Sequence, residues 1–243
     1  MPAQTMTFGP LVVTFDERVL RPRPWTSLQA EWAAELDADL PSGPVLELCS
    51  GAGHIGQAAA VLTGRDLVQV DVDPHACALA EANAAANVAD ARVDVRCGDL
   101  AAMVEAHERF PLVLADPPYL PRDEVGDWPD DPALAVDGGP DGREILRRCL
   151  AVAGAHVQPG GAVLLQALGR EQVEALAGDL DGAGLALVDL RAHDDRRAVA
   201  LLRPVDVRHG TQVRDHGSAS GERASSSQEG RAAAPVPCHS GAA

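Results

Sequence analysis

Two hydrophobic patterns alternate along the chain: short continuous apolar runs, and longer segments in which apolar residues recur at helical spacing. The runs predict seven buried strands, at residues 45–48, 67–70, 93–95, 112–115, 162–166, 185–190 and 198–202. The longer segments predict helices, in a segment opened by Thr26 and at residues 54–62, 74–87, 142–155 and 170–183. Alternating strands and helices are typical of an open, mostly parallel sheet with helices on both faces. We therefore predict an α/β fold.

Both ends of this pattern predict departures from a purely parallel sheet. Near the N-terminus, Leu11–Phe15 and Arg18–Leu20 are expected to pair as a short hairpin. Thr26 and Gln29 have the spacing of a capping box at the start of the first helix. Only the short polar link 193–197 separates the last two strands, so we expect them to form an antiparallel pair at one edge of the sheet.

We expect the chain to consist of three parts. Residues 1–25 are expected to form the hairpin and a loop beside the ligand pocket, and residues 26–207 the α/β domain. Residues 208–243 contain no Leu, Ile, Met or aromatic residue, so they cannot bury enough apolar surface to offset the entropy lost on ordering. We predict that this C-terminal segment is a disordered tail.

The charge of the chain restricts its partners. The 243 residues include 36 acids and 20 bases, and the formal net charge is −16. Nucleic acids and anionic membranes attract basic surfaces, so the charge argues against both. No apolar run approaches the roughly 18 residues that span a bilayer, and residues 1–20 lack the apolar core of a signal peptide. Five scattered cysteines show neither a metal-ligand nor a disulfide pattern, which favours a cytoplasmic location.

The first candidate binding segment begins at the end of the strand 45–48. Open α/β sheets bind ligands at this end of their strands. It reads Glu47-Leu-Cys49-Ser50-Gly51-Ala52-Gly53-His-Ile-Gly56. Gly51 and Gly53 allow a tight turn and close approach of the backbone to a ligand, and Gly56 allows a helix to pack closely on the strand. Asp71 ends the next strand, where a carboxylate accepts the hydroxyls of a ribose. This pattern also fits NAD.

Glu47 favours a cationic cofactor over NAD. A carboxylate within a buried strand destabilises the fold unless it is hydrogen-bonded, so we expect it to accept bonds from amides of the glycine turn. A carboxylate that reaches solvent at the end of the strand is the alternative. The charge of Glu47 suits S-adenosyl-L-methionine, which carries a sulfonium and an ammonium group, better than it suits a pyrophosphate.

A second candidate segment, Asp116-Pro117-Pro118-Tyr119, follows the fourth strand. The prolines remove two N–H donors and fix two φ angles, and Pro117 holds Asp116 in an extended conformation. The resulting rigid corner of hydrogen-bond acceptors suits a planar –NH2 group. Tyr119, the only tyrosine, is placed to cover one face of such a substrate. The alternative interpretation of this tetrapeptide, taken alone, is a turn that the prolines stiffen and that binds no ligand.

Together these motifs resemble the class I S-adenosylmethionine-dependent N-methyltransferases. The segment Pro22-Arg23-Pro24-Trp-Thr26 is similar to the Pro-Arg-Pro-x-Thr segment of the glutamine N5-methyltransferases that modify peptide chain release factors, and residues 132–142 and 158–161 match that family too. The resemblance covers residues 8–203 and implies a seven-stranded, mostly parallel Rossmann-like methyltransferase sheet. It implies contacts from the cofactor S-adenosyl-L-methionine to Glu47, Cys49, Ser50, Gly51, Ala52, Gly53, Asp71 (ribose), and Asp99 and Leu100 (adenine). It implies that the target amide lies against Asp116, Pro117, Pro118 and Tyr119.

The chain departs from the family pattern in three ways. The family usually has Asn where this chain has Asp116, and a Glu at the end of the fifth strand where this chain has Gln166. Its bacterial members also carry an N-terminal helical domain, whereas few residues precede the expected hairpin here. In some lineages shorter relatives work with a small partner subunit, and such a partner is an expectation for this chain.

The loop 116–141 bears on the choice of substrate. It contains eight carboxylates and one base, so it repels phosphates and favours a protein target, although a solvated acidic loop without function is the alternative. Three other functions remain open: methylation of an amino group on a nucleobase in RNA or DNA, cofactor binding without catalysis, and NAD-dependent oxidoreduction.

Overall fold

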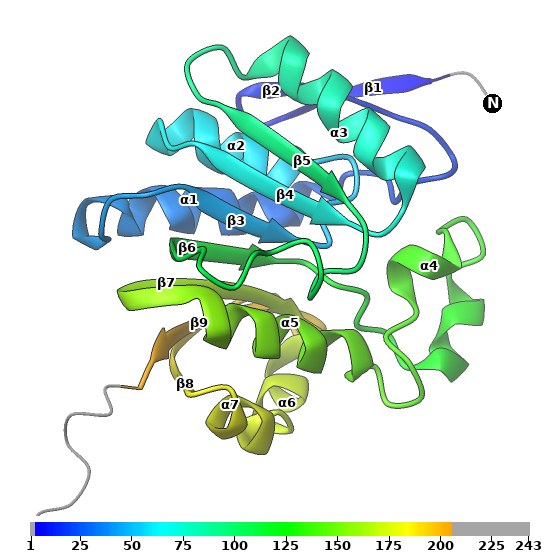
Figure 1. Ribbon diagram of the computed structural model, residues 1–243. Coiled ribbons are helices and arrows are strands. Elements are labelled where there is room, and N and C mark those ends of the chain that lie inside the picture. The colour runs from blue at the N-terminus through cyan, green and yellow to red at the C-terminus, as the bar shows by residue number, and fades with distance from the viewer. Residues whose placement is uncertain (1–2, 206–243) are drawn as a thin grey trace, which may run out of the picture. The chain divides into compact units, whose positions relative to one another are not determined.

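The computed structural model describes residues 3–205, which form a seven-stranded sheet and a separate two-stranded hairpin (Figure 1). The sheet has the order β5-β4-β3-β6-β7-β9-β8. The first five strands in this order are parallel, and β9 runs antiparallel to both of its neighbours. The strands are β3 (Val45–Leu48), β4 (Leu67–Asp71), β5 (Val93–Cys97), β6 (Phe110–Ala115), β7 (Val157–Ala167), β8 (Leu185–Asp194) and β9 (Arg197–Pro204). The predicted fold class and the antiparallel edge pair are confirmed.

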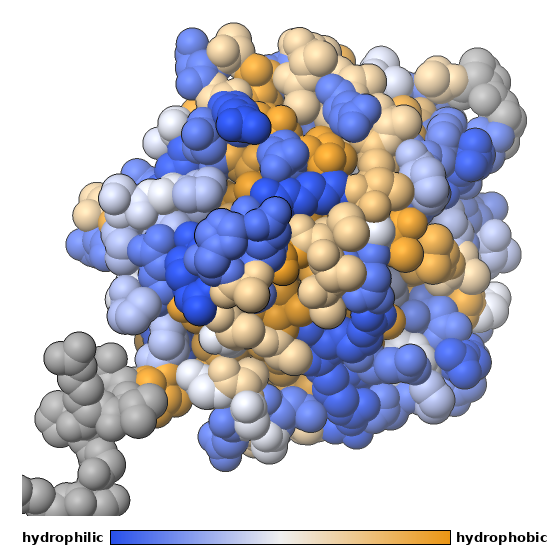
Figure 2. Space-filling model, viewed as in Figure 1, coloured by the Kyte–Doolittle hydropathy of each residue, from blue (hydrophilic) through white to orange (hydrophobic). Residues whose placement is uncertain are grey.

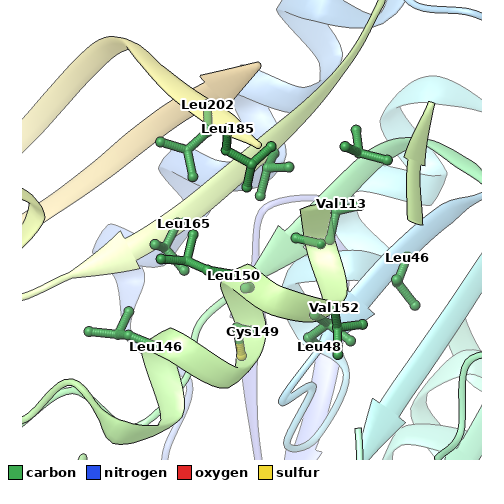
Figure 3. Close-up of a cluster of buried hydrophobic side chains, with 14 of the residues drawn as sticks. Leu46, Leu48, Val113, Leu146, Cys149, Leu150, Val152, Leu165, Leu185 and Leu202 are labelled. Atoms are coloured by element: carbon green, nitrogen blue, oxygen red, sulfur yellow. The ribbon is translucent and has the colours of Figure 1, made fainter. Parts of the chain in front are cut away.

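Helices cover both faces of the sheet, and each face has its own hydrophobic core. Helices α1, α2 and α3 pack on one face together with the hairpin, and α5, α6 and α7 pack on the other. Figure 3 shows side chains of α5, such as Leu146 and Leu150, among strand residues such as Val113 and Leu165. The helices are α1 (Ser27–Leu36), α2 (His54–Thr63), α3 (Pro74–Asn87), α4 (Ala133–Val136), α5 (Glu144–His156), α6 (Gly169–Glu174) and α7 (Ala177–Gly182), with the 3-10 helices η1 (Pro24–Thr26), η2 (Asp37–Asp39) and η3 (Arg122–Asp127).

Strands β3 and β6 lie in the middle of the sheet, and both of their faces are covered. Every residue of Val45–Leu48 and of Phe110–Ala115 is buried. By contrast, the edge strand β8 exposes most of its residues. Parallel strands covered on both faces appear in the sequence as continuous apolar runs, which is why the hydrophobic pattern located them.

The N-terminal hairpin pairs different residues from those predicted. Strand β1 (Gln4–Phe8) pairs with β2 (Leu11–Phe15), and Arg18–Leu20 forms no strand. The prediction missed β1 because only Phe8 of this polar strand is buried. The hairpin is fastened to α3 by Asn83, whose amide exchanges hydrogen bonds of 2.8 and 2.9 Å with the backbone of Thr14.

Two predictions about helices were also wrong. Thr26 and Gln29 form no capping box, because Thr26 Oγ1 donates to the Arg23 carbonyl at 2.8 Å and Gln29 reaches the sheet instead. The segment 170–183 forms two short helices, α6 and α7, separated where the chain buries Leu176 completely. The loop after β6 contains η3 and α4, so it is more ordered than the expected polar loop.

The predicted tail, residues 208–243, lies outside the described residues. Among residues 3–205, no helix has the length and apolar character that a membrane crossing requires. Figure 2 shows apolar residues gathered in the middle of the face seen in Figure 1, between more hydrophilic margins.

Candidate active site

The two predicted binding segments follow adjacent strands at the centre of the sheet. In the register of the parallel pair β3–β6, Leu48 lies beside Ala115. The glycine turn that starts after Leu48 and the corner that starts at Asp116 therefore leave the same edge of the sheet side by side, since neighbouring strands lie about 4.8 Å apart. Strand order reverses between β3 and β6, which is the position where open α/β sheets bind ligands.

The glycine turn adopts the tight conformation that its spacing predicts. Gly51 and Gly53 have φ angles of +53° and +84°, and the Gly53 amide closes the turn with a 2.8 Å bond to the Ser50 carbonyl. A Cβ added at Gly51 would meet no atom within 4 Å, so space lies open beside this residue. Among residues 3–205, Cys49 is the only residue other than glycine with a positive φ, at +59°. Such strain is concentrated at functional sites.

Asp71 fastens the glycine turn to the end of β4. Its Oδ2 accepts a hydrogen bond from the Gly51 amide at 2.7 Å, and its Oδ1 accepts one from the Asp73 amide at 2.9 Å. Burial raises the pKa of the Asp71 carboxyl above its ordinary value. Each carboxylate oxygen accepts more than one hydrogen bond, so both remain able to receive hydroxyls of a ribose.

Asp99 and Leu100 lie beside Asp71, because the Gly98 amide donates to the Asp71 carbonyl at 2.8 Å. Leu100 is buried in the core on the α5 side of the sheet. Asp99 is half exposed and forms an ion pair with Arg148 of α5. The structure therefore places these two residues next to Asp71, the candidate ribose-binding residue, but the Asp99 carboxylate already has a cationic partner.

Glu47 is buried within β3, but its hydrogen bonds differ from those predicted. Its Oε1 accepts a bond of 2.9 Å from the Gly56 amide in the first turn of α2, and its Oε2 accepts one from Gln69. The amides of the glycine turn itself do not reach it. Gln69 links Glu47 to the glycine turn instead, because its Nε2 also donates a hydrogen bond to the Gly53 carbonyl at 3.0 Å. Burial raises the pKa of Glu47 to about 8.

The corner after β6 presents the carboxylate of Asp116, which is half buried and accepts no hydrogen bond from the described residues. Among residues 3–205 no group donates a hydrogen bond to Asp116, and burial raises its pKa to about 7. Burial, and the nearby charge of Asp116, also raise the pKa of Tyr119. Gln172 of α6 holds the corner rigid, since its Nε2 donates to the carbonyls of Tyr119 at 2.8 Å and Gly142 at 3.1 Å.

A cavity opens at this corner. It contains about 830 Å³ of empty space, including its open mouth, and Asp116, Pro117 and Tyr119 line one side. The loop after β6 contributes Trp128 to its wall. Arg23 closes another side by pairing with Asp131 of that loop. The N-terminal segment, the corner and the loop therefore enclose one space large enough for a side chain and part of its backbone.

Several residues of this site were not found by sequence reasoning. Trp25 lines the cavity, and the Arg197 guanidinium lies 3.9 Å from the centre of its ring. Gln29, interpreted as a capping residue, donates from Nε2 to the Ala115 carbonyl at 3.1 Å. Cys149 of α5 places its sulfur 3.8 Å from that of Cys49. A polar residue at a buried position of the first helix is the signal that would have singled out Gln29, whereas nothing in the sequence links Arg197 or Cys149 to the site.

Known proteins are similar in sequence to this chain. The family model of the methyltransferase small domain matches residues 32–127. The release factor glutamine methyltransferase of Cereibacter sphaeroides is 36% identical over 188 residues, which are 73% of this chain and 64% of the relative. That of Deinococcus radiodurans is 32% identical over 193 residues, which are 76% of this chain and 68% of the relative. The chain belongs to the release factor glutamine methyltransferase family.

The chain is also similar to other methyltransferases. A ribosomal protein uL3 glutamine methyltransferase of Bradyrhizobium diazoefficiens is 32% identical over 173 residues, which are 65% of this chain and 54% of that protein. The chain thus spans between about half and two thirds of the length of these curated relatives. A methyltransferase structure from Pyrococcus furiosus has the same fold, with a TM-score of 0.59 at 18% identity over 81% of this chain and 90% of that one.

The cofactor of this methyltransferase family is S-adenosyl-L-methionine, and the residues at the strand ends fit it. Burial raises the pKa of Glu47, Asp71 and Asp116, and none of the three forms an ion pair within residues 3–205. A cation among them would lower these pKa values and stabilise the ionised carboxylates. The site therefore suits a sulfonium with an ammonium group better than a pyrophosphate. Within the described part of the chain, no cluster of His, Cys, Asp or Glu is arranged to hold a metal.

Proposed function

We propose that this protein transfers a methyl group from S-adenosyl-L-methionine to the side-chain amide nitrogen of a glutamine in a protein, with a peptide chain release factor as the first candidate. The single observation that supports the proposal best is the register of β3 and β6, which sets the glycine turn beside the acceptor-lined corner. The names of the relatives support glutamine as the target, since both release factor and uL3 enzymes methylate that residue type.

The corner supplies the means to activate an amide. The bound cofactor supplies an electrophilic methyl group on its sulfonium. The ionised Asp116 and the Pro117 carbonyl accept the two N–H groups of the target amide, which orients the nitrogen lone pair and increases its electron density. Positive charge develops on the nitrogen during transfer, so the Asp116 carboxylate stabilises the transition state more than the ground state. A carboxylate with a pKa near 7 is also able to take the proton that the nitrogen then loses.

The charge of the loop after β6 supports a protein rather than a nucleic-acid substrate. Asp123, Asp127 and Asp130 of the loop after β6 are mostly exposed and form no ion pair among residues 3–205. Together with the chain charge of −16, these exposed carboxylates repel a phosphate backbone and attract a basic protein surface. A translation protein as substrate places the enzyme in the cytoplasm, and a small partner subunit would enlarge the surface that grips it.

Mass mapping of a labelled methyl group tests the proposal. The full chain is incubated with methyl-labelled cofactor and, in separate reactions, with purified release factor, ribosomal protein uL3 and total RNA. We expect label on one glutamine of the release factor. Label on a nucleobase would overturn the proposal in favour of an amino-group RNA methyltransferase. Calorimetry that shows binding of NAD and none of S-adenosyl-L-methionine would exclude a methyltransferase altogether.

The methylation rate is expected to depend on the ionisation of Asp116. Its raised pKa of about 7 means that the acceptor-only carboxylate is lost as the pH falls through this range, so the rate should fall at acidic pH. A bound cation shifts this acidic limb of the pH–rate profile to lower pH, because an opposite charge favours the ionised form of Asp116. The measurement is the single-turnover rate between about pH 5.5 and 8.5. Asp116→Asn should lose the limb, and a variant that keeps it would show that another group titrates.

A further inference from the structure

Two cysteine sulfurs from distant parts of the chain meet beside the glycine turn. Cys49 begins the turn after β3, and Cys149 lies 100 residues later, on α5. Their Sγ atoms are 3.8 Å apart, within hydrogen-bond distance, and neither cysteine is in a disulfide. Cys149 belongs to the hydrophobic core on the α5 side of the sheet, and Cys49 packs against that core (Figure 3). The proposed methyl transfer uses neither thiol.

The sulfurs are close enough for a disulfide to form with a small movement. A disulfide has an S–S length of about 2.05 Å, so the two Sγ atoms must approach each other by about 1.8 Å. Helix α5 resists this movement, because Leu146 and Leu150, which flank Cys149 in the sequence, are completely buried. The approach therefore falls mainly on the turn, where Cys49 has a φ of +59°, a strained conformation for a residue with a Cβ.

An oxidant from solvent reaches Cys49 before it reaches Cys149. Cys49 is half-buried, whereas only 1% of Cys149 is exposed. The hydrogen bond with Cys149, together with burial, raises the pKa of the Cys49 thiol, and the thiolate is the form that reacts with oxidants. We therefore expect oxidation of this pair to be slow in dilute peroxide and to need a small oxidant in excess.

We propose that Cys49 and Cys149 form a redox-modification site, at which hydrogen peroxide converts the two thiols into a disulfide. The sulfur of Cys49 attacks one peroxide oxygen and the O–O bond breaks, which gives a sulfenic acid and one water. The sulfur of Cys149 then displaces the hydroxyl group, so that the S–S bond forms and a second water leaves. The two thiols lose two electrons and two protons in all, and a dithiol reductant reverses the change.

The disulfide lowers the affinity for the cofactor, because it draws the glycine turn towards α5. Two residues beyond Cys49, the Gly51 amide donates a hydrogen bond of 2.7 Å to Asp71, the candidate ribose-binding residue. A displacement of Cys49 moves Gly51 relative to Asp71 and so distorts the cofactor site. This consequence rests on the proposed function, which places the cofactor at the glycine turn, whereas formation of the disulfide itself does not.

Mass mapping of the oxidised full chain tests the disulfide. The reduced protein is incubated with excess hydrogen peroxide, its remaining thiols are alkylated, and it is digested without reductant. We expect a linked pair of peptides that contain Cys49 and Cys149 and that dithiothreitol separates. Cys97 is exposed, so the loss of its free thiol shows that the oxidant has acted. A sample in which Cys97 has reacted completely while Cys49 and Cys149 remain unlinked would overturn the proposal.

Calorimetry with S-adenosyl-L-methionine tests the effect on the cofactor, and each protein is compared with its own reduced form. We expect peroxide to weaken binding by the unaltered protein about 10-fold or more, dithiothreitol to restore it, and Cys49→Ser to keep its affinity. Equal weakening in Cys49→Ser would assign the effect to another group and overturn the inference, as would a linked pair with unchanged affinity. A reduced, unaltered protein that binds no cofactor would instead overturn the proposed function, and mass mapping would still test the disulfide.

Discussion

Replacement of Asp116 by Ala is expected to lower the methylation rate on the order of 10²–10³-fold, a much larger effect than the loss of cofactor affinity that removal of one of the three carboxylates causes. The variant removes the acceptor that orients the target amide and stabilises the charge developing on its nitrogen. No described residue donates a hydrogen bond to this carboxylate, so its loss leaves no buried partner unsatisfied and should not unfold the chain. Single-turnover rates, together with calorimetry of cofactor binding, measure the two effects separately.

Asp116→Asn is the matched control. The amide keeps an acceptor oxygen in nearly the same volume but has no charge, so we expect it to retain much more activity than Asp116→Ala. If Asp116→Ala were as active as the unaltered protein, the corner would have no role in catalysis. If Asn and Ala were equally inactive while binding the cofactor normally, the charge of the carboxylate, rather than its acceptor geometry, would carry the effect.

Replacement of Gly56 by Ala is expected to destabilise the fold by about 2–3 kcal/mol and to weaken cofactor binding. A Cβ at this position would lie 2.8 Å from Glu47 Cδ and 3.0 Å from Leu67 Cδ1, in the first turn of α2. Glu47 cannot move aside without losing its bonds to Gly56 and Gln69, and Gln69 also holds the Gly53 carbonyl. Thermal unfolding should show a melting temperature lower by roughly 4–12 °C.

Gly178→Ala is the control for this effect. Gly178 lies in α7 with ordinary helical geometry, and an added Cβ there would meet nothing within 4 Å. Ala is the better helix former, so this variant should be neutral or more stable by up to about 1 kcal/mol. Were Gly56→Ala as stable as Gly178→Ala, the buried network of Glu47 and Gln69 would not be what supports the glycine turn.

The strands of the central sheet were predictable because each is buried on both faces and therefore apolar throughout. The run 45–48 matches β3 to the residue, and the helix predicted at 74–87 matches α3, which has Pro74 in its first turn and Asp73 as its cap. Strand β1 escaped prediction because it is a polar strand of a two-stranded hairpin, and the bonds that fasten the hairpin to α3 come from its partner strand β2. The break between α6 and α7 falls at residues 175–176, where the sequence has neither Gly nor Pro, so no local signal marks it.

The two motifs and the strands that they follow can be recognised in the amino-acid sequence because they depend on local geometry: glycines for the turn, prolines for the corner, and apolar runs for the strands. Which distant residues complete the site depends on the packing of the whole domain. Glu47 binds the Gly56 amide and Gln69 rather than the glycine turn, and Gln29 binds Ala115 rather than capping its helix. Hydrogen bonds between side chains far apart in the chain depend on how helices dock on the sheet, and no pattern of spacing along the chain encodes that docking.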